Sequence, residues 1–441
     1  MDRRSLCLMA LGIIFLCGWR NSPAQVFFDS PQLPGRIITA IEITGNRVTR
    51  PEIILREMHT QAGSTADEDR LQLDLLRVKA LGLFNHVEFH LTERGGPVVL
   101  VIAVTEEWYI FPLPFWDFKD NDPQKLIYGF RYRQNNFSGR NETLILSLWE
   151  GEDRGFRALH ATPWVRGTPN FSRSLDFAQY STDSRRLALK DLGLEERHAS
   201  ADIHFGKRWT IEGFTDIGAR FRLVRGSHPL QLATGGGLDR VLDVRGAAVW
   251  DRRDLKIFPR RGFYLEGTVT QGWILDSSLD FQRLQADVRA YYQMNSRISM
   301  AGRMQWNAGW GNVPPYDWIV VDGTSPLRSS GLSDEGTSFW GAFWETRMDI
   351  LKVRSFTWEK APIFPEYFKN LEYGLSAEIF VDVGDAYQSY RQVSWKATQI
   401  GYGAGLMMIL PYVDVLRLEM SFNPDYSWNA GKYGLKTDIS F

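Results

Sequence analysis

Cysteine is nearly absent from this chain. The 441 residues include two cysteines, Cys7 and Cys17, and both precede Gln25. The rest of the chain therefore has no thiol that could form a disulfide, attack a substrate or bind a metal ion. An excess of charge of one sign is also missing, since 51 Lys and Arg oppose 52 Asp and Glu. Net charge thus gives no reason to expect a nucleic acid as a partner.

Long hydrophobic runs are missing as well. A transmembrane helix needs about 18 or more apolar residues in succession. The one long apolar run, Leu6–Trp19, is shorter than this and is closed by Arg20. Two arginines precede the run and small residues follow it, so residues 1–24 are interpreted as a secretory signal peptide. A membrane anchor is the alternative interpretation.

Tryptophan and tyrosine are missing from residues 25–107. All 16 Tyr, and every Trp except Trp19, lie at Trp108 or later. These side chains concentrate at membrane interfaces, so the sequence predicts a membrane domain that begins near Trp108. A large soluble β-rich core would explain the aromatic content but not its sudden start. We expect an N-terminal linker at 25–35, a small domain at 36–107 and the membrane domain at 108–441.

The sequence also lacks the motifs of common enzymes. No G-x-S-x-G, H-E-x-x-H or G-x-x-x-x-G-K-[ST] pattern occurs. His86 and His90 share one face of an expected strand, but two histidines without a third ligand are more often surface residues than a metal site. The sequence therefore predicts no catalytic residue, no metal and no cofactor. An outer-membrane enzyme is the least favoured alternative.

Alternating segments fill the chain after Trp108. In Leu371–Gly384 every second residue from Leu371 is apolar, whereas the residues between them include Glu372, Glu378 and Asp382. This period of two recurs to the C-terminus without helical periodicity, which is typical of transmembrane β-strands. A secreted chain without a membrane helix can enter a bilayer as a closed barrel, because closed sheets satisfy every backbone group.

The fold class is therefore predicted as membrane all-β, a 16-stranded antiparallel transmembrane β-barrel preceded by one small α+β domain. About sixteen strands are expected, at 108–118, 126–135, 141–150, 155–164, 172–183, 198–209, 210–224, 240–252, 262–274, 280–292, 297–311, 339–351, 371–384, 398–410, 414–424 and 432–441. An even count lets the first and last strands meet and close the barrel. The longest connection, 312–338, is too long for a passive turn and predicts a functional loop.

The small domain is predicted as β-α-α-β-β. Strands are expected at 36–44, 87–91 and 98–105, with helices at 49–59 and 66–81. This order resembles a POTRA domain, a small periplasmic module. The residues that match its pattern are Gly45, Asn46, Thr49, Ile53, Gly63, Leu71, Leu81, Gly82, Phe84 and Val87.

A POTRA domain followed by a sixteen-stranded barrel resembles the BamA/TamA superfamily of outer-membrane assembly and translocation proteins. Three stretches of the barrel carry the resemblance. Asn135–Asn141 is similar to the turn after the family's second strand, Asp251–Gly262 to the turn between its eighth and ninth strands, and Phe380–Gly384 to its thirteenth-strand motif.

The resemblance implies that the long loop folds back into the barrel and presents an Arg to acidic residues of the inner wall. The matching residues here are Arg328 in the loop, Glu345 and Asp382 as acceptors, and Gly384. Two serines follow Arg328 where the family has Gly and an aromatic residue. Because Gly permits a positive φ and Ser does not readily, the resemblance does not fix the backbone conformation of the loop tip. Both acceptors lie on polar strand faces, where they could instead be solvated charges that line a pore.

The resemblance also implies a function. The periplasmic domain would receive an unfolded polypeptide client by pairing with an exposed strand edge, for which we expect Val87, Phe89 and Leu91. The seam between the first and last barrel strands would admit the client to the membrane, and the expected seam residues are Ile110, Phe111, Ile439 and Phe441.

The expected partners are the outer-membrane bilayer, unfolded outer-membrane or secreted polypeptides, and periplasmic accessory proteins, with no nucleic acid. The expected location is the outer membrane, with the N-terminal domain in the periplasm. The alternative function is a gated pore for polypeptide, lipid or solute, with the long loop as its plug.

Overall fold

The structure is a computed structural model. It describes residues 25–30, 32–119, 124–168, 170–321, 326–328, 334–361, 365–389, 398–411, 414–423 and 432–436. The expected signal peptide, at 1–24, lies outside this part of the chain. No helix among the described residues is long and apolar enough to cross a membrane.

The N-terminal domain is a four-stranded sheet with two helices. Its elements are β1 (Gln25–Phe28), β2 (Ile38–Thr44), α2 (Pro51–Leu55), α3 (Glu68–Lys79), β3 (Phe84–Glu93) and β4 (Val98–Glu106), and the sheet order is β1-β3-β4-β2. The Asp67 side chain accepts from the Arg70 backbone N–H and caps α3. Leu71, Leu75 and Val78 of α3 are fully buried in the domain core. The expected order of elements is therefore present from β2 to β4.

The start of this domain differs from the expectation. Residues 25–35 are not a linker, because β1 pairs in parallel with β3 over Glu88–Leu91 and Leu33 is fully buried in the domain core. Strand β3 consequently lies between β1 and β4, and the edge at Val87, Phe89 and Leu91 is not free. Four residues are too short to show a period of two, so this strand gave no signal in the sequence.

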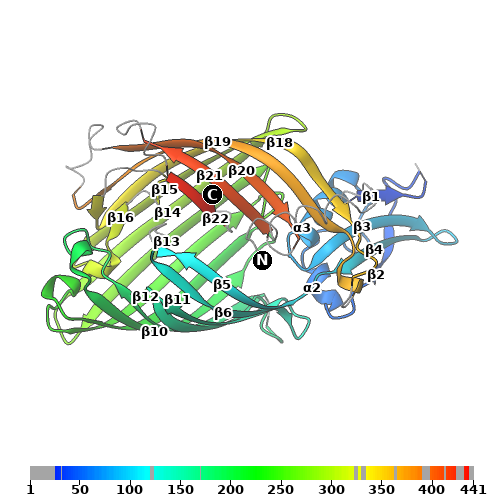
Figure 1. Cartoon of the computed structure of the whole chain (residues 1–441). Helices are drawn as coiled ribbons and strands as arrows, with labels where there is room; N and C mark the ends of the chain where they lie inside the picture. Colours follow the sequence, from blue (N-terminus) through cyan, green and yellow to red (C-terminus); the bar gives the residue numbers. More distant parts are fainter. Residues whose placement is uncertain are drawn as a thin grey trace.

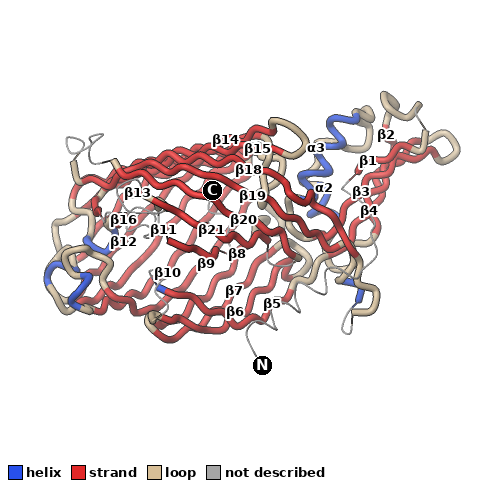
Figure 2. The backbone as a smooth tube through the Cα atoms, turned by 45° about the horizontal axis from the view of Figure 1, so that its top comes forward, coloured by secondary structure: helices blue, strands red, loops and turns tan. Residues whose placement is uncertain are grey.

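The barrel is one sixteen-stranded antiparallel sheet (Figures 1 and 2). Its order follows the chain from β5 to β22, with β16 and β17 left out. The strands are β5 (Ile110–Phe118), β6 (Leu126–Phe137), β7 (Glu142–Gly151), β8 (Arg154–Thr162), β9 (Phe171–Asp183), β10 (Glu195–Arg208), β11 (Gly213–Gly226), β12 (Leu238–Asp251), β13 (Gly262–Leu275), β14 (Asp280–Gln293), β15 (Ile298–Gly311), β18 (Ser338–Phe356), β19 (Leu371–Tyr387), β20 (Gln399–Leu410), β21 (Asp414–Phe422) and β22 (Lys432–Lys436).

The two faces of the barrel wall have opposite polarity. On β18, Trp344 and Met348 are 48% and 49% exposed on the outer face, whereas Glu345 and Arg347 are 0% and 1% exposed inside. An apolar outer face and a polar interior are the arrangement of a transmembrane barrel, because lipid replaces water around the outer side chains. The polar faces expected from the sequence are therefore the inner faces of these strands.

The N-terminal domain lies against one end of the barrel (Figure 1). Arg208 in β10 forms two bonds of 2.5 and 2.6 Å with the Glu57 carboxylate, and Arg77 in α3 pairs with Glu212 at 2.5 Å. Strand β18 runs five residues beyond its expected end at Leu351. Its hairpin with β19 thereby reaches the domain, where Lys79 pairs with Glu372.

The predicted turn at Asn135–Asn141 forms part of the same junction. Asn136 has a φ of 53° and is nearly fully buried, and its amide donates to the Thr49 hydroxyl at 2.8 Å. A Cβ on Gly139 would lie 2.0 Å from the Val48 carbonyl oxygen, so this position requires glycine. Thr49 was expected at the start of a helix that runs to residue 59, but α2 ends at Leu55 and the Thr49 side chain joins the domain to the barrel instead.

Candidate functional site: the loop bound inside the barrel

The long connection between β15 and β18 folds toward the barrel interior. Its short strands β16 (Ile319–Val321) and β17 (Asp334–Gly336) pair with each other and lie against β19. Gly336 permits this approach, because a Cβ there would lie 2.4 Å from the Tyr387 backbone. Leu327 is fully buried in an apolar cluster with Val321 and residues of the wall. The loop is thus packed against the barrel wall.

Arg328 is held by three strands of the wall. Its Nε and Nη2 donate to the two Asp382 oxygens of β19 at 2.7 and 2.6 Å, and its backbone N–H donates to Asp382 at 3.0 Å. Its Nη1 donates to Glu345 of β18 at 2.9 Å and to Glu419 of β21 at 3.1 Å. The guanidinium also stacks 3.7 Å from the centre of the Phe380 ring. We call Arg328 with Asp382, Glu345 and Glu419 the loop lock.

Two further buried arginines share the carboxylates of the loop lock. The Glu345 Oε2 atom accepts from Arg347 Nε and Nη2 at 2.9 and 2.7 Å, while Oε1 accepts from Arg417 Nη1 at 2.9 Å. Arg347 and Arg417 are 1% and 0% exposed. Breaking a buried ion pair of this kind costs about 3–5 kcal/mol, because it leaves an uncompensated charge. The loop lock is therefore a tightly held contact of the loop with the wall.

The structure brings together all four residues expected at the lock. Arg328, Asp382 and Glu345 bond directly, and Gly384 lies beside them, where a Cβ would be 2.5 Å from the Trp340 carbonyl oxygen of β18 and 3.1 Å from Leu327 of the loop. The sequence reasoning missed Glu419 and Arg417. Arg417 and Glu419 are two positions apart in the expected strand 414–424, so both side chains fall on its polar face. This spacing could have identified them as inner-wall charges.

Two more ion pairs hold the loop elsewhere. Asp317, in the one-turn 3₁₀ helix Pro315–Asp317, accepts from Arg222 of β11 at 2.7 and 2.8 Å. Burial alone would raise the pKa of the Asp317 carboxyl, but the Arg222 charge lowers this pKa to about 2. Glu335 of β17 accepts from Arg186 at 2.9 and 3.0 Å. The loop is therefore attached to β11 and to the connection between β9 and β10, as well as to β18, β19 and β21.

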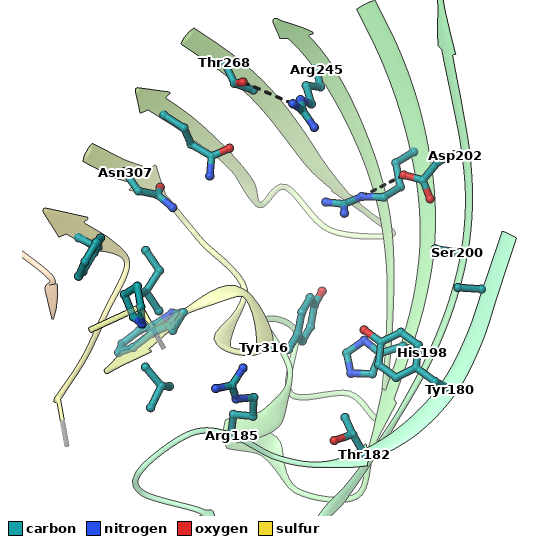
Figure 3. Close-up of a pocket in the computed structure, with 18 of the residues that line it drawn as sticks. Tyr180, Thr182, Arg185, His198, Ser200, Asp202, Arg245, Thr268, Asn307 and Tyr316 are labelled. Carbon is teal, nitrogen blue, oxygen red and sulfur yellow. Dashed lines mark hydrogen bonds and ion pairs between the residues drawn. The ribbon is translucent and has the colours of Figure 1, made fainter. Parts of the chain in front are cut away.

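A cavity of about 960 Å³ lies beside this loop (Figure 3). Tyr316 of the loop points toward His198, which stacks on Tyr180 with ring centres 4.8 Å apart. Charges of both signs line the cavity, including Arg157, Arg245, Asp202 and Glu266. Such a mixed lining offers no preference for a ligand of one charge. No group of three or more metal-binding side chains occurs among the described residues.

The expected seam residues are placed in part. Ile110 and Phe111 begin β5, which is one end of the sheet order, and β22 is the other end. Ile439 and Phe441 lie outside the described residues. Val87, Phe89 and Leu91 do not form an open edge: their side chains are fully buried in the domain core, and β1 covers the strand.

These features define the class of protein. A barrel with an apolar outer face, a charged interior and a loop bound to its inner wall, preceded by a small α+β domain, is an outer-membrane barrel protein. Residues 37–107 match the family model POTRA, described as a surface antigen variable number repeat. Residues 128–439 match the Omp85 superfamily domain. The chain therefore belongs to the Omp85 superfamily, and its N-terminal domain is a POTRA domain in the periplasm.

Relatives support this assignment. The chloroplastic outer envelope protein 80 of Oryza sativa subsp. japonica is 24% identical over 362 residues, which are 74% of this chain and 52% of that protein. The outer membrane protein assembly factor BamA of Neisseria meningitidis serogroup B is 36% identical over 78 residues, which are 17% of this chain and 10% of that protein. The chain thus spans about half the length of the rice relative.

Solved structures share the fold. BamA from Haemophilus ducreyi lacking POTRA domains 1-3 superposes with a TM-score of 0.53 at 14% identity, over 91% of this chain and 83% of that chain. CdiB from Escherichia coli superposes with a TM-score of 0.56 at 12% identity, over 92% and 75% of the two chains. The predicted fold, a POTRA domain before a sixteen-stranded barrel, is confirmed.

Proposed function

We propose that this protein assists the insertion or translocation of polypeptides at the outer membrane. The POTRA domain receives the client, and the seam between β5 and β22 admits it. The observation that carries the proposal is the position of the loop lock in the wall. Its carboxylates come from β18, β19 and β21, and β21 pairs directly with the edge strand β22. The lock therefore holds the strands that lead to the seam.

The site of client capture in the POTRA domain is proposed anew, because β1 covers β3. The sheet order leaves β1 and β2 as its outermost strands. An outer strand presents backbone groups that can pair with an extended segment whatever its side chains. Folding of the client in the membrane supplies the driving force, and the proposed activity needs neither catalysis nor a cofactor.

Disulfide trapping tests the role of the seam. Ile110→Cys is combined in turn with a cysteine at each of residues 432–436, in a mature chain that supplies no other thiol. Insertion of an outer-membrane protein client into proteoliposomes should stop in the oxidised form and return on reduction. The control pair, Ile203→Cys with Ala219→Cys, joins register partners within the wall and should have no effect. Insertion that continues through a locked seam would contradict the proposal.

A gated pore is the second candidate function. The cavity of about 960 Å³ beside the inward-folded loop favours it, because release of the loop would widen an existing space. The two candidates differ in a bilayer recording. In a pore, Arg328→Gln should raise the conductance, and the seam disulfide should leave transport unchanged.

A further inference from the structure

The connection between β12 and β13, residues 252–261, reaches across the barrel interior. Phe258 of this turn is 5% exposed and forms an apolar cluster with Met407 of β20 and Val415 of β21. In the sheet order, β13 and β20 are separated by β14, β15, β18 and β19. The turn therefore touches a distant part of the wall, beside the strands that lead to the seam.

The turn has a well-defined internal structure. The Asp254 carboxylate accepts from three backbone N–H groups, those of Leu255, Arg260 and Arg261, at 2.9, 3.0 and 3.2 Å. At Gly262, with a φ of 103°, a Cβ would lie 2.0 Å from the Arg252 carbonyl oxygen. A turn held in this way presents Phe258 to the wall without a large loss of conformational entropy on contact.

Strand β18 binds the same turn. Arg260 pairs with Asp349 at 2.7 Å, and Arg347 Nη1 donates to the Pro259 carbonyl oxygen at 3.3 Å. The guanidinium groups of Arg347 and Arg260 lie 5.3 and 5.5 Å from the centre of the Phe258 ring. Both contacts on β18 come from side chains that are at most 5% exposed. We call Phe258, Pro259 and Arg260 of this turn, with these contacts, the periplasmic latch.

One carboxylate joins the periplasmic latch to the loop lock. Glu345 accepts from Arg347 through Oε2 and from Arg328 through Oε1. Loss of the turn would remove the Pro259 contact of Arg347, and Arg347 is one of the two buried arginines, with Arg417, that orient Glu345 toward Arg328. Loss of Arg328 has the converse effect on Arg347. The two contacts thus share one buried acceptor, which is a physical route for coupling.

We propose that the periplasmic latch is a second closure of the barrel, and that Glu345 couples its release to the release of the loop lock. The turn holds β20 and β21 from the periplasmic side, while Arg328 holds β18, β19 and β21 from the loop side. By reciprocity, each contact stabilises the other by the same free energy. The proposal concerns the state of the barrel and does not depend on which cargo passes through it.

Two single-cysteine reporters test the proposal in the chain from residue 25 onward, which has no other thiol, reconstituted in vesicles. Met407→Cys reports the periplasmic latch, because Phe258 packs on this fully buried residue. Leu327→Cys reports the loop lock, because Leu327 is fully buried beside Arg328. Reaction of each thiol with a small maleimide should be slow. Arg260→Gln should speed the reaction at both reporters by about tenfold, within the range of coupling between sites in proteins.

The neighbouring residue provides a matched control. Arg261 bonds to Gln293 in an exposed position, so Arg261→Gln should leave both reporters slow. In the reverse direction, Arg328→Gln should speed the reaction at Met407→Cys. Phe258→Ala is a second test of the latch. If Phe258→Ala fails to fold, Arg260→Gln still tests the proposal.

Three outcomes would overturn the proposal. If Arg260→Gln and Phe258→Ala leave Met407→Cys slow, the turn does not close this part of the barrel. If they speed Met407→Cys but leave Leu327→Cys slow, the latch exists without coupling to the loop. A double variant, Arg260→Gln with Arg328→Gln, should speed each reporter by less than the product of the single effects, and a full product would also contradict the coupling.

Discussion

Arg328 forms a two-pronged ion pair with Asp382, a residue 54 positions further along the chain, with N–O distances of 2.7 and 2.6 Å. The pair has the fork geometry that makes Arg–carboxylate contacts specific as well as strong. Lysine could not reproduce it, because an ammonium group is a single point of charge. The contact joins a loop to a strand of the wall, so we expect it to help hold the loop inside the barrel.

We expect Arg328→Gln to destabilise the protein by about 3–5 kcal/mol, because the buried Asp382 would lose its ion pair, while Glu345 and Glu419 would keep Arg347 and Arg417. Asp382→Asn should cost less, since Glu345 and Glu419 still accept from Arg328. Urea unfolding in detergent, followed by the shift between folded and unfolded bands on a gel, measures both.

The control for this prediction is an ion pair in an exposed setting. Arg157 pairs with Asp176 at 2.5 Å but is 48% exposed, and Arg157→Gln should cost no more than about 1 kcal/mol. If Arg328→Gln behaves like this control, the loop lock does not hold the loop.

The sequence predicted the barrel well because its wall repeats one local rule. A period of two shows strand and face together, so the boundaries of β13 and β14 were expected to within one residue. The same rule placed Glu345 and Asp382 on the inner face. The resemblance then paired them with Arg328, which periodicity alone could not do.

Other contacts join residues that are far apart in the sequence, and no local pattern predicts which of them meet. Asp317 and Arg222 are 95 positions apart, and nothing in either segment names the other as its partner. The prediction of an open edge in the POTRA sheet was wrong for a similar reason. Whether β3 is an edge depends on β1, a four-residue strand beyond the expected domain boundary. Phe258 packs on Met407 of β20 and Val415 of β21, but the sequence around it indicates only a turn.

The junction of the POTRA domain with the barrel should weaken in salt. Its ion pairs, Arg208 with Glu57 and Arg77 with Glu212, are 12–21% exposed at their side chains, so ions in solution can screen them in part. Lys79→Cys with Glu372→Cys reports docking, because these side chains meet in the wild type. Arg208→Gln should slow formation of this disulfide several-fold, and about 1 M salt should slow it in the wild type.

Arg197→Gln is the control for docking, since Arg197 is 65% exposed and pairs with Glu195 elsewhere on the barrel. It should leave the disulfide rate unchanged. A rate that is insensitive to both salt and Arg208→Gln would show that the uncharged contacts at Asn136 and Gly139 hold the domain by themselves.

Removal of β1 should expose the backbone of β3. Val26 and Phe28 pack on the domain core, and the Phe27 ring stacks on His90 with centres 4.8 Å apart. Deletion of residues 25–28 loses this packing, so it should lower stability and speed hydrogen exchange of the β3 amides that face β1. Exchange measured by mass spectrometry over 88–91 checks this, with the β4 amides, which face β3 and β2, as the internal control. Unchanged exchange would mean that β1 does not protect this strand.

The attachment of the loop through Asp317 should resist acid until about pH 4. The pKa of this carboxyl is about 2 in the folded protein and about 3.9 in an unfolded chain. A lowered pKa contributes stability that is fully present above the unfolded value and is lost as the pH falls from about 4 toward 2. Asp317→Asn removes this contribution at every pH. The Tm difference between wild type and Asp317→Asn should therefore stay constant from pH 8 to about 5 and shrink below about 4.

The exposed pair of Arg240 with Asp276 serves as the comparison, and Asp276→Asn should change the Tm little at any pH. A difference for Asp317→Asn that stays constant down through pH 4 and below would mean that the carboxyl has the same pKa in the folded and the unfolded chain. Arg222 would then not hold Asp317 as an anion, and the loop would depend on Arg328 and Glu335 for its place in the barrel.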